Sequence, residues 1–129
     1  MPIPITALYA GIMGLILFAL DFHVGGMRGR KKISVYDAGD REMAIAVRRQ
    51  GNFIEHVPLA LILIGVLELS GASALGLHLL GGGLTIARIA HPFGLDYEVA
   101  NKPARLVGAG LTGLVTVVAS IWAIWTFVS

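Results

Sequence analysis

The sequence contains no cysteine, and only 14% of its 129 residues are charged. The absence of cysteine excludes disulfides, thiolate metal sites and a cysteine nucleophile supplied by the chain itself. About a quarter of the residues in a typical soluble domain are Asp, Glu, Lys or Arg. The low charge, the 56% hydrophobic content and the mean hydropathy of +0.78 therefore predict an integral membrane protein.

Long apolar runs account for most of the chain. No charged residue occurs in Ile3–Leu20 or in Leu69–Ala87, and Leu106–Val128 is apolar or small throughout. Each run approaches or reaches the roughly 20 residues that a helix needs to cross a bilayer. A shorter apolar stretch, from about Phe53 to Leu67, gives another span. We predict an all-α membrane protein with one domain over residues 1–129, a four-transmembrane-helix bundle with helices at about 4–21, 41–69, 74–91 and 103–128.

Local signals set these helix boundaries. The pair Gly25-Gly26 is expected to end the first helix, since glycine is a poor helix former. Asp40 is expected to cap the second helix, with Met43 in its first turn. Pro92 is expected to end the third helix, and Pro103 suits the first turn of the fourth.

Basic residues predict the orientation in the membrane. Four of the ten lie in the segment after the first apolar run, at Arg28, Arg30, Lys31 and Lys32. Cytoplasmic loops are rich in Lys and Arg, so this loop is expected in the cytoplasm and both termini on the opposite side. The loop is short and directly follows a membrane span, so we predict no nucleic-acid partner. The first segment lacks a basic start and a small-residue cleavage site, so we do not expect a signal peptide.

A polar stripe enters the second span. Arg48, Asn52, Glu55 and His56 fall within about a quarter-turn of one helix face, at about 100° per residue. Ionisable groups at membrane depth are costly, and they usually face a protein interior or a water-filled cavity. The stripe is therefore the first candidate for a functional site.

The topology places further polar residues at the same membrane boundary. Arg88 and His91 share one face at the end of the third helix, and Arg105 is the last charge before a long apolar run. Several guanidinium groups around one carboxylate would favour an anionic or zwitterionic ligand such as a small peptide. The predicted layer comprises Arg48, Arg49, Asn52, Glu55, His56, Arg88, His91 and Arg105.

Structural explanations compete with ligand binding at several of these positions. Lysine and arginine at helix ends often extend toward water, which suits Lys102 and Arg49 and competes with a ligand role for Arg88 and Arg105. Glu55 could instead form a structural ion pair with an arginine, Arg48 or Arg105.

Other polar residues are assigned no ligand. Glu55 and His56 point about 100° apart on a helix, which makes them poor ligands of one metal, so we predict no metal site. His78 is expected to be a packing residue, and Glu68 is expected to be solvated. Small residues at close-packing spacing are expected to bring helices together, within the chain or between copies, at Ala7/Gly11, Ala72/Gly76 and Ala109/Gly113.

The spaced residues Arg48, Asn52, Glu55 and Pro58, on the second of four predicted helices, resemble the MAPEG family, the membrane-associated proteins of eicosanoid and glutathione metabolism. The resemblance covers nearly the whole chain, including the basic first loop. That family includes microsomal glutathione transferases, prostaglandin E synthase, the leukotriene synthase and small bacterial members. The resemblance implies a homotrimer of four-helix protomers in a bacterial inner membrane.

The resemblance also implies glutathione as co-substrate, bound between adjacent subunits near the cytoplasmic face. Arg48, Asn52 and Glu55 match the residues that hold the tripeptide, and Arg88 matches an arginine that lies in the site. Arg105 matches by position an arginine that stabilises the glutathione thiolate, and we assign it the catalytic role. The thiolate would attack a lipophilic electrophile, or reduce a hydroperoxide, at a groove open to membrane lipids.

The chain departs from the family pattern at aromatic positions. His56 and His91 occupy positions where many members have tyrosine, and we count both as candidate glutathione-binding residues. The loss of these tyrosines favours a second function, a non-catalytic lipid-binding or scaffold protein on the same fold. A small four-helix drug exporter is disfavoured, because such proteins carry a carboxylate within the first span and Ile3–Leu20 has none.

Overall fold

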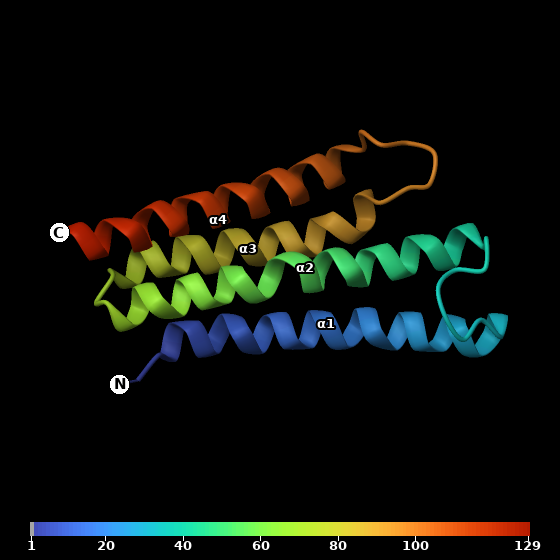
Figure 1. Cartoon of the computed structure of the whole chain (residues 1–129), viewed down its shortest axis with the longest axis horizontal. Helices are drawn as coiled ribbons and strands as arrows, with labels where there is room; N and C mark the ends of the chain where they lie inside the picture. The colour runs from blue at the N-terminus through green and yellow to red at the C-terminus, as the bar shows by residue number, and fades with distance from the viewer. Residues whose placement is uncertain (1) are drawn as a thin grey trace.

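The structure, a computed structural model, describes residues 2–129, and its secondary structure consists of four antiparallel α-helices. Both termini lie at the same end of the bundle (Figure 1). We call the opposite end, which carries the α1–α2 and α3–α4 loops, the distal end. The predicted all-α fold is confirmed. The helices are α1 (Pro4–Lys31), α2 (Arg41–Leu69), α3 (Ala74–Gly94) and α4 (Pro103–Val128).

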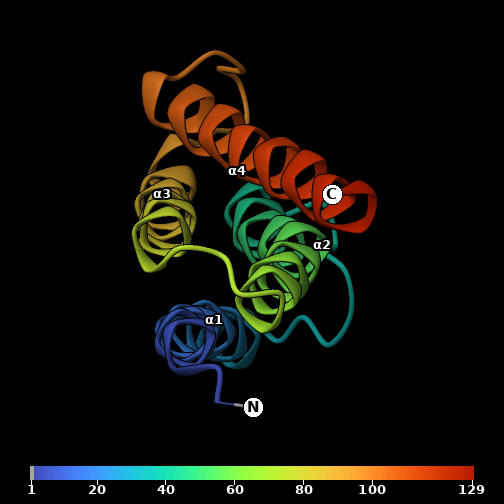
Figure 2. The same cartoon turned by 90° about the vertical axis from the view of Figure 1, so that its left-hand side faces the viewer.

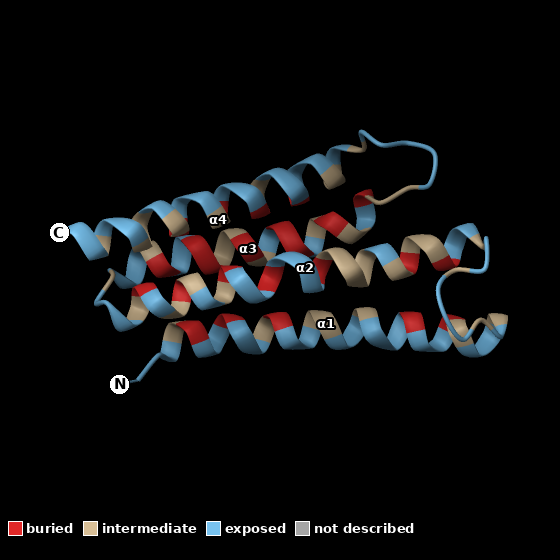
Figure 3. Ribbon diagram, in the orientation of Figure 1, coloured by how far each residue is buried: buried red, intermediate tan, exposed pale blue. Residues whose placement is uncertain are grey.

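The helices α1, α2 and α4 are each long and apolar enough to cross a membrane. Seen end-on, α1 and α4 occupy opposite corners and are separated by α2 and α3 (Figure 2). Buried positions line the bundle interior and exposed positions cover its outer surface (Figure 3). Large apolar side chains such as Leu15, Phe22 and Ile86 are exposed on that surface. This distribution suits a lipid environment, where exposed apolar side chains carry no hydrophobic penalty.

The predicted end of the first helix near Asp21 is wrong, because α1 continues to Lys31. Glycine costs a helix interior about 1 kcal/mol relative to alanine, so Gly25-Gly26 weakens the helix without ending it. Apolar burial between the extended α1 and the start of α2 offsets that cost. The buried cluster consists of Val24, Met27, Met43 and Ala46.

The other boundaries lie close to the predicted ones. The Asp40 carboxylate caps α2 by accepting a hydrogen bond from the Met43 amide at 2.9 Å, as predicted. The third helix runs past Pro92 to Gly94, beyond its predicted end at His91. Gly94 packs directly against the backbone of α4 at Arg105, where no side chain would fit, and this contact holds the last turn in place.

Glu68 was predicted to be solvated, but its carboxylate instead binds the beginning of α1. Its carboxylate oxygens accept hydrogen bonds from the Ile5 amide at 2.9 Å and from the Thr6 amide at 2.7 Å. The Thr6 hydroxyl donates a third bond, at 2.6 Å. Amide groups in the first turn of a helix lack partners within that helix, and the positive end of the helix dipole favours an anion.

Tyr9 and His78 form a second polar contact near the same end. The Tyr9 hydroxyl lies 2.9 Å from His78 Nδ1 and donates to the His78 carbonyl oxygen at 3.2 Å. The Tyr9 ring rests directly on Gly81, where a Cβ atom would overlap it. His78 therefore helps to pack α1 against α3, with a partner distant in sequence.

The start of α2 contacts the α3–α4 loop at the distal end. Arg41 Nη1, at the start of α2, lies 2.6 Å from Glu98 Oε1 in the α3–α4 loop. The same guanidinium group stacks on the Tyr97 ring, with 4.8 Å between the guanidinium carbon and the ring centroid. Within the α3–α4 loop, the hydrogen bond from Lys102 is the main factor that lowers the pKa of Asp96, to about 2.

Replacement of Glu68 by alanine should lower the thermal unfolding midpoint by several degrees, because three donors at the start of α1 lose their acceptor. Circular dichroism of the protein in lipid nanodiscs would measure the midpoint. Glu42→Ala is the matched control, since Glu42 is an exposed glutamate of the same helix that forms a surface ion pair with Lys31. Equal midpoints for the two variants would contradict the assigned capping role.

Candidate functional site

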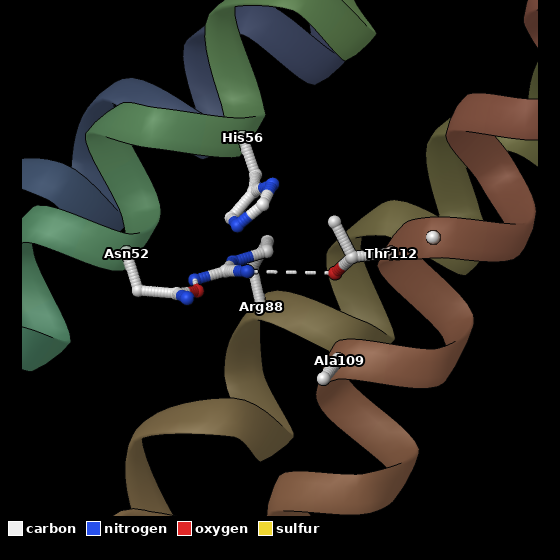
Figure 4. A pocket seen from close by; sticks show the side chains of 6 residues that line it. Asn52, His56, Arg88, Ala109 and Thr112 are labelled. Carbon is white, nitrogen blue, oxygen red and sulfur yellow. Dashed lines mark hydrogen bonds between the residues drawn. The ribbon is translucent and has the colours of Figure 1, made fainter.

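The buried guanidinium group of Arg88 is the centre of the candidate site. Arg88 is 1% exposed, which excludes extension toward water, one of the two alternatives considered for it. Its Nη2 atom donates to Asn52 Oδ1 of α2 at 2.8 Å, and its Nη1 atom donates to Thr112 Oγ1 of α4 at 3.4 Å. The Phe53 ring lies beneath it, with 5.5 Å between the guanidinium carbon and the ring centroid. Side chains from α2 and α4 therefore converge on the charge that α3 supplies (Figure 4).

The charge of Arg88 has no counterion among residues 2–129. Both of its hydrogen-bond acceptors are neutral, and its Nε atom is buried without a partner in this part of the chain. Burial of an unpaired charge is costly, because the surrounding protein solvates it less well than water does. An arrangement that keeps a guanidinium group buried and uncompensated is suited to bind an anion.

A small pocket lies beside Arg88, with a volume of about 110 Å³. Asn52 and His56 approach it from α2, and Thr112 and Ala109 approach it from α4 (Figure 4). His56 is exposed at its rim. The lining residues are Asn52, His56, Arg88, Ala109, Thr112 and Gly113.

Arg48 and Glu55 form an ion pair on the same face of α2, one of the two structural pairs considered for Glu55. The Nη1–Oε1 and Nη2–Oε2 distances are both 3.2 Å, and each side chain is about half exposed, at 56% and 52%. The pair passes over Gly51, where a Cβ atom would lie 3.0 Å from Arg48 Nη1. Exposed pairs of this kind contribute little stability, so both groups can exchange partners at low cost.

His91 lies one turn beyond Arg88 on α3 and is 2% exposed. It packs against Gly108 of α4, where a Cβ atom would lie 2.6 Å from the His91 Cβ atom. The His91 Nδ1 atom is buried without a hydrogen-bond partner in residues 2–129. The contact brings α4 close to α3 next to the Arg88 pocket.

Arg105 points away from this pocket. Its Nη1 atom donates to the Ala100 carbonyl oxygen of the α3–α4 loop at 3.0 Å, and the side chain is half-buried. Arg49 also lies apart, half-buried in a groove between α1 and α2 that His23 and Glu42 help to line. The predicted layer thus divides into a pocket with Asn52, His56 and Arg88, an ion pair of Arg48 and Glu55, and three separate residues, His91, Arg49 and Arg105.

Thr112 and Phe53 were not predicted as site residues. Both are uncharged residues in apolar stretches, and a threonine in a membrane helix commonly satisfies its hydroxyl on the carbonyl four residues earlier. Thr112 does make that bond, to Gly108 at 2.7 Å. Its additional contact with Arg88 depends on how α3 and α4 pack, which no local sequence signal reports.

Comparisons with known proteins agree with the resemblance. The model of the MAPEG family matches residues 6–125. The chain is 28% identical, over 119 residues, to the inner membrane protein YecN of Escherichia coli, in strain K12 and in an O6:H1 strain. The alignment covers 92% of this chain and 91% of each relative. No solved structure gives a significant match.

Replacement of Arg88 by methionine should stabilise the ligand-free protein by about 1–4 kcal/mol, because an apolar side chain of similar length removes a buried charge. Thermal unfolding in nanodiscs without added thiols would measure the change. Arg30→Met, at an exposed position of α1, is the control and should leave the midpoint near that of the wild type. A lower midpoint for Arg88→Met would contradict this prediction. It would mean that the hydrogen bonds to Asn52 and Thr112 already offset the free energy needed to bury the charge.

Proposed function

Since this chain belongs to the MAPEG family, we propose that it is a glutathione-dependent transferase or peroxidase that acts on lipophilic electrophiles or hydroperoxides. The family includes glutathione transferases and peroxidases. The observation that carries the proposal is the uncompensated charge of Arg88, which is buried beside a pocket and held only by neutral acceptors. Glutathione is an anionic thiol at neutral pH, and it would supply the missing negative charge.

The proposal gives the arginines different roles. Arg88 binds an anionic group of glutathione in the pocket that Asn52 and His56 help to line. The exposed Arg48–Glu55 pair opens to bind a carboxylate and an ammonium group of the tripeptide. Arg105, held by a single loop carbonyl, turns toward the sulfur and lowers its pKa, since a nearby cation favours the thiolate. His91 packs α3 against Gly108 of α4 beside the pocket.

A lipid-facing groove is suited to the second substrate. It lies between α1 and α2, has a volume of about 230 Å³, and shares Phe53 with the Arg88 site. Phe53 thus separates a charged pocket from an apolar groove, so a lipophilic molecule could approach a bound thiolate from the membrane. The lining residues are Ala10, Met13, Gly14, Leu17, Phe53, Val57, Pro58 and Leu61.

We propose that the site is completed in a homotrimer. The pocket of about 110 Å³ is well below the roughly 300–1,000 Å³ of typical ligand pockets, so one protomer cannot enclose a tripeptide. Gly11, Gly110 and Gly113 have open space where a side chain would be, although small residues at membrane interfaces usually let helices approach closely. A neighbouring copy would use these surfaces.

Native mass spectrometry of the protein released from mild detergent should therefore show three copies of the chain. Replacement of Gly113 by leucine should shift the distribution toward monomers, because the added side chain would occupy the surface proposed for the neighbouring copy, while a Cβ atom at this position meets nothing within 4 Å in the protomer. Gly25→Leu is the control, at an exposed position of α1 that also has open space but lies outside the proposed interface. A wild-type protein that stays monomeric across detergents would contradict the trimer.

Isothermal titration calorimetry should detect glutathione binding to the wild type. We expect Arg88→Gln to weaken binding about thirtyfold or more, because a buried charge pair is lost.

We expect Arg105→Gln to bind glutathione but to leave the pKa of the glutathione thiol higher than in the wild type, measured by the ultraviolet absorbance of the thiolate across a pH series. Arg30→Gln is the control. No binding and no conjugation of a standard electrophile by the wild type would refute this function.

A non-catalytic lipid-binding or scaffold protein is the second candidate. The apolar groove between α1 and α2 and the histidines at positions 56 and 91 favour it. Phospholipid that copurifies with the protein, together with full biological activity of Arg105→Gln, would support this alternative over the enzyme.

The relatives and the charge distribution support a location for the chain. We propose that the chain resides in an inner membrane, as the name of YecN states for that protein. Arg28, Arg30, Lys31 and Lys32 gather near the distal end, so this end faces the cytoplasm and both termini lie on the other side.

A further inference from the structure

Thr112 is buried in an apolar helix and contacts the charge of Arg88. It is 3% exposed, and its hydroxyl donates to the Gly108 carbonyl oxygen at 2.7 Å. Because that bond uses the only hydroxyl proton, the remaining lone pairs of Oγ1 can act only as acceptors. One of them accepts from Arg88 Nη1 at 3.4 Å, and Figure 4 shows the hydroxyl directed at the guanidinium group.

The two acceptors of Arg88 lie on opposite sides of its guanidinium group. Asn52 of α2 holds Nη2 and Thr112 of α4 holds Nη1 (Figure 4). A carboxylate at either position would cancel the charge, whereas an amide and a hydroxyl fix the group and leave its charge available. A rigid, charged donor loses less entropy when it binds an anion than a mobile one does.

A neighbouring threonine distinguishes the contact with Arg88 from ordinary hydrogen bonding within a helix. Thr116, one turn further along α4, makes the same kind of backbone bond, to the Thr112 carbonyl oxygen at 2.9 Å, and has no hydrogen bond to Arg88. Both threonines therefore donate their hydroxyl hydrogen to a backbone carbonyl oxygen of α4. Contact with the buried charge belongs to Thr112 alone of the two.

We propose that Thr112 is a positioning residue, which fixes the guanidinium plane of Arg88 toward the pocket so that an anionic group of the co-substrate binds there. The inference rests on the proposed function for the identity of that co-substrate. Thr112 does not itself touch the reacting atoms. Its hydroxyl acts through Arg88, and an isosteric side chain without an acceptor abolishes the effect.

Thr112→Val tests the proposal in the full-length protein in nanodiscs, because valine keeps the shape and removes the acceptor. We expect glutathione binding by calorimetry to weaken about tenfold, since a hydrogen bond to a charged group is lost. For the transferase reaction, KM for glutathione should rise similarly while kcat changes little. Thr112→Ser should restore wild-type values, and Thr116→Val is the matched control that should match the wild type. Thr112→Ala serves in place of valine if that variant does not fold.

A second readout needs no ligand. Nuclear magnetic resonance of isotope-labelled arginine side chains should show a slowly exchanging Nε–H signal for Arg88, assigned by its loss in Arg88→Lys. We expect Thr112→Val to broaden this signal or speed its exchange with water, and Thr112→Ser and Thr116→Val to leave it unchanged.

The two readouts separate the inference from the proposed function. If the wild type binds glutathione and Thr112→Val leaves both affinity and the Arg88 signal unchanged, the positioning role is overturned and the function stands. If the wild type does not bind glutathione, the proposed function fails, and the Arg88 signal alone then decides whether Thr112 positions the guanidinium group.

Discussion

The burial of one arginine without a counterion is the constraint on which this site depends. Arg88 is removed from water between α2, α3 and α4, and an amide, a hydroxyl and an aromatic face contact its guanidinium group. These groups come from α2 and α4, and Arg88 comes from α3, so the bundle must bring three helices together at one point. The contact of Gly108 with His91 lets α4 approach α3 closely enough for Thr112 to reach the guanidinium group.

Several other polar groups of the bundle have partners within the protein, as a membrane environment favours. Glu68 takes up the free amides at the start of α1, and Tyr9 joins α1 to His78 of α3. At the distal end, the Arg41–Glu98 pair links α2 to the α3–α4 loop. Arg88 differs from these groups. Each of them has a hydrogen-bond partner or a partner of opposite charge, whereas the guanidinium group of Arg88 has no counterion among residues 2–129.

That contrast is the basis for the proposal that the pocket beside Arg88 binds an anionic thiol. Arg48 is already paired with Glu55 at the surface, so it can exchange partners, while Arg88 offers a fixed charge. Phe53 contacts the charge on one side and lines an apolar groove on the other, which is the arrangement that the proposed reaction would need. The small volume of the pocket and the unoccupied glycine surfaces both favour completion by neighbouring copies.

The sequence by itself determined the membrane class, the four helices, the bounds of α2 and α4 and the polar stripe of Arg48, Asn52, Glu55 and His56. These features follow from hydropathy, helix periodicity and local caps such as Asp40, which act over a few residues. Only the tertiary structure decided that α1 continues through Gly25-Gly26, that Glu68 caps α1, that Arg105 turns to a loop carbonyl, and that Thr112 holds Arg88. The physical reason is that burial between helices outweighs local helix preference, and that the partner of each polar side chain depends on which helices pack together.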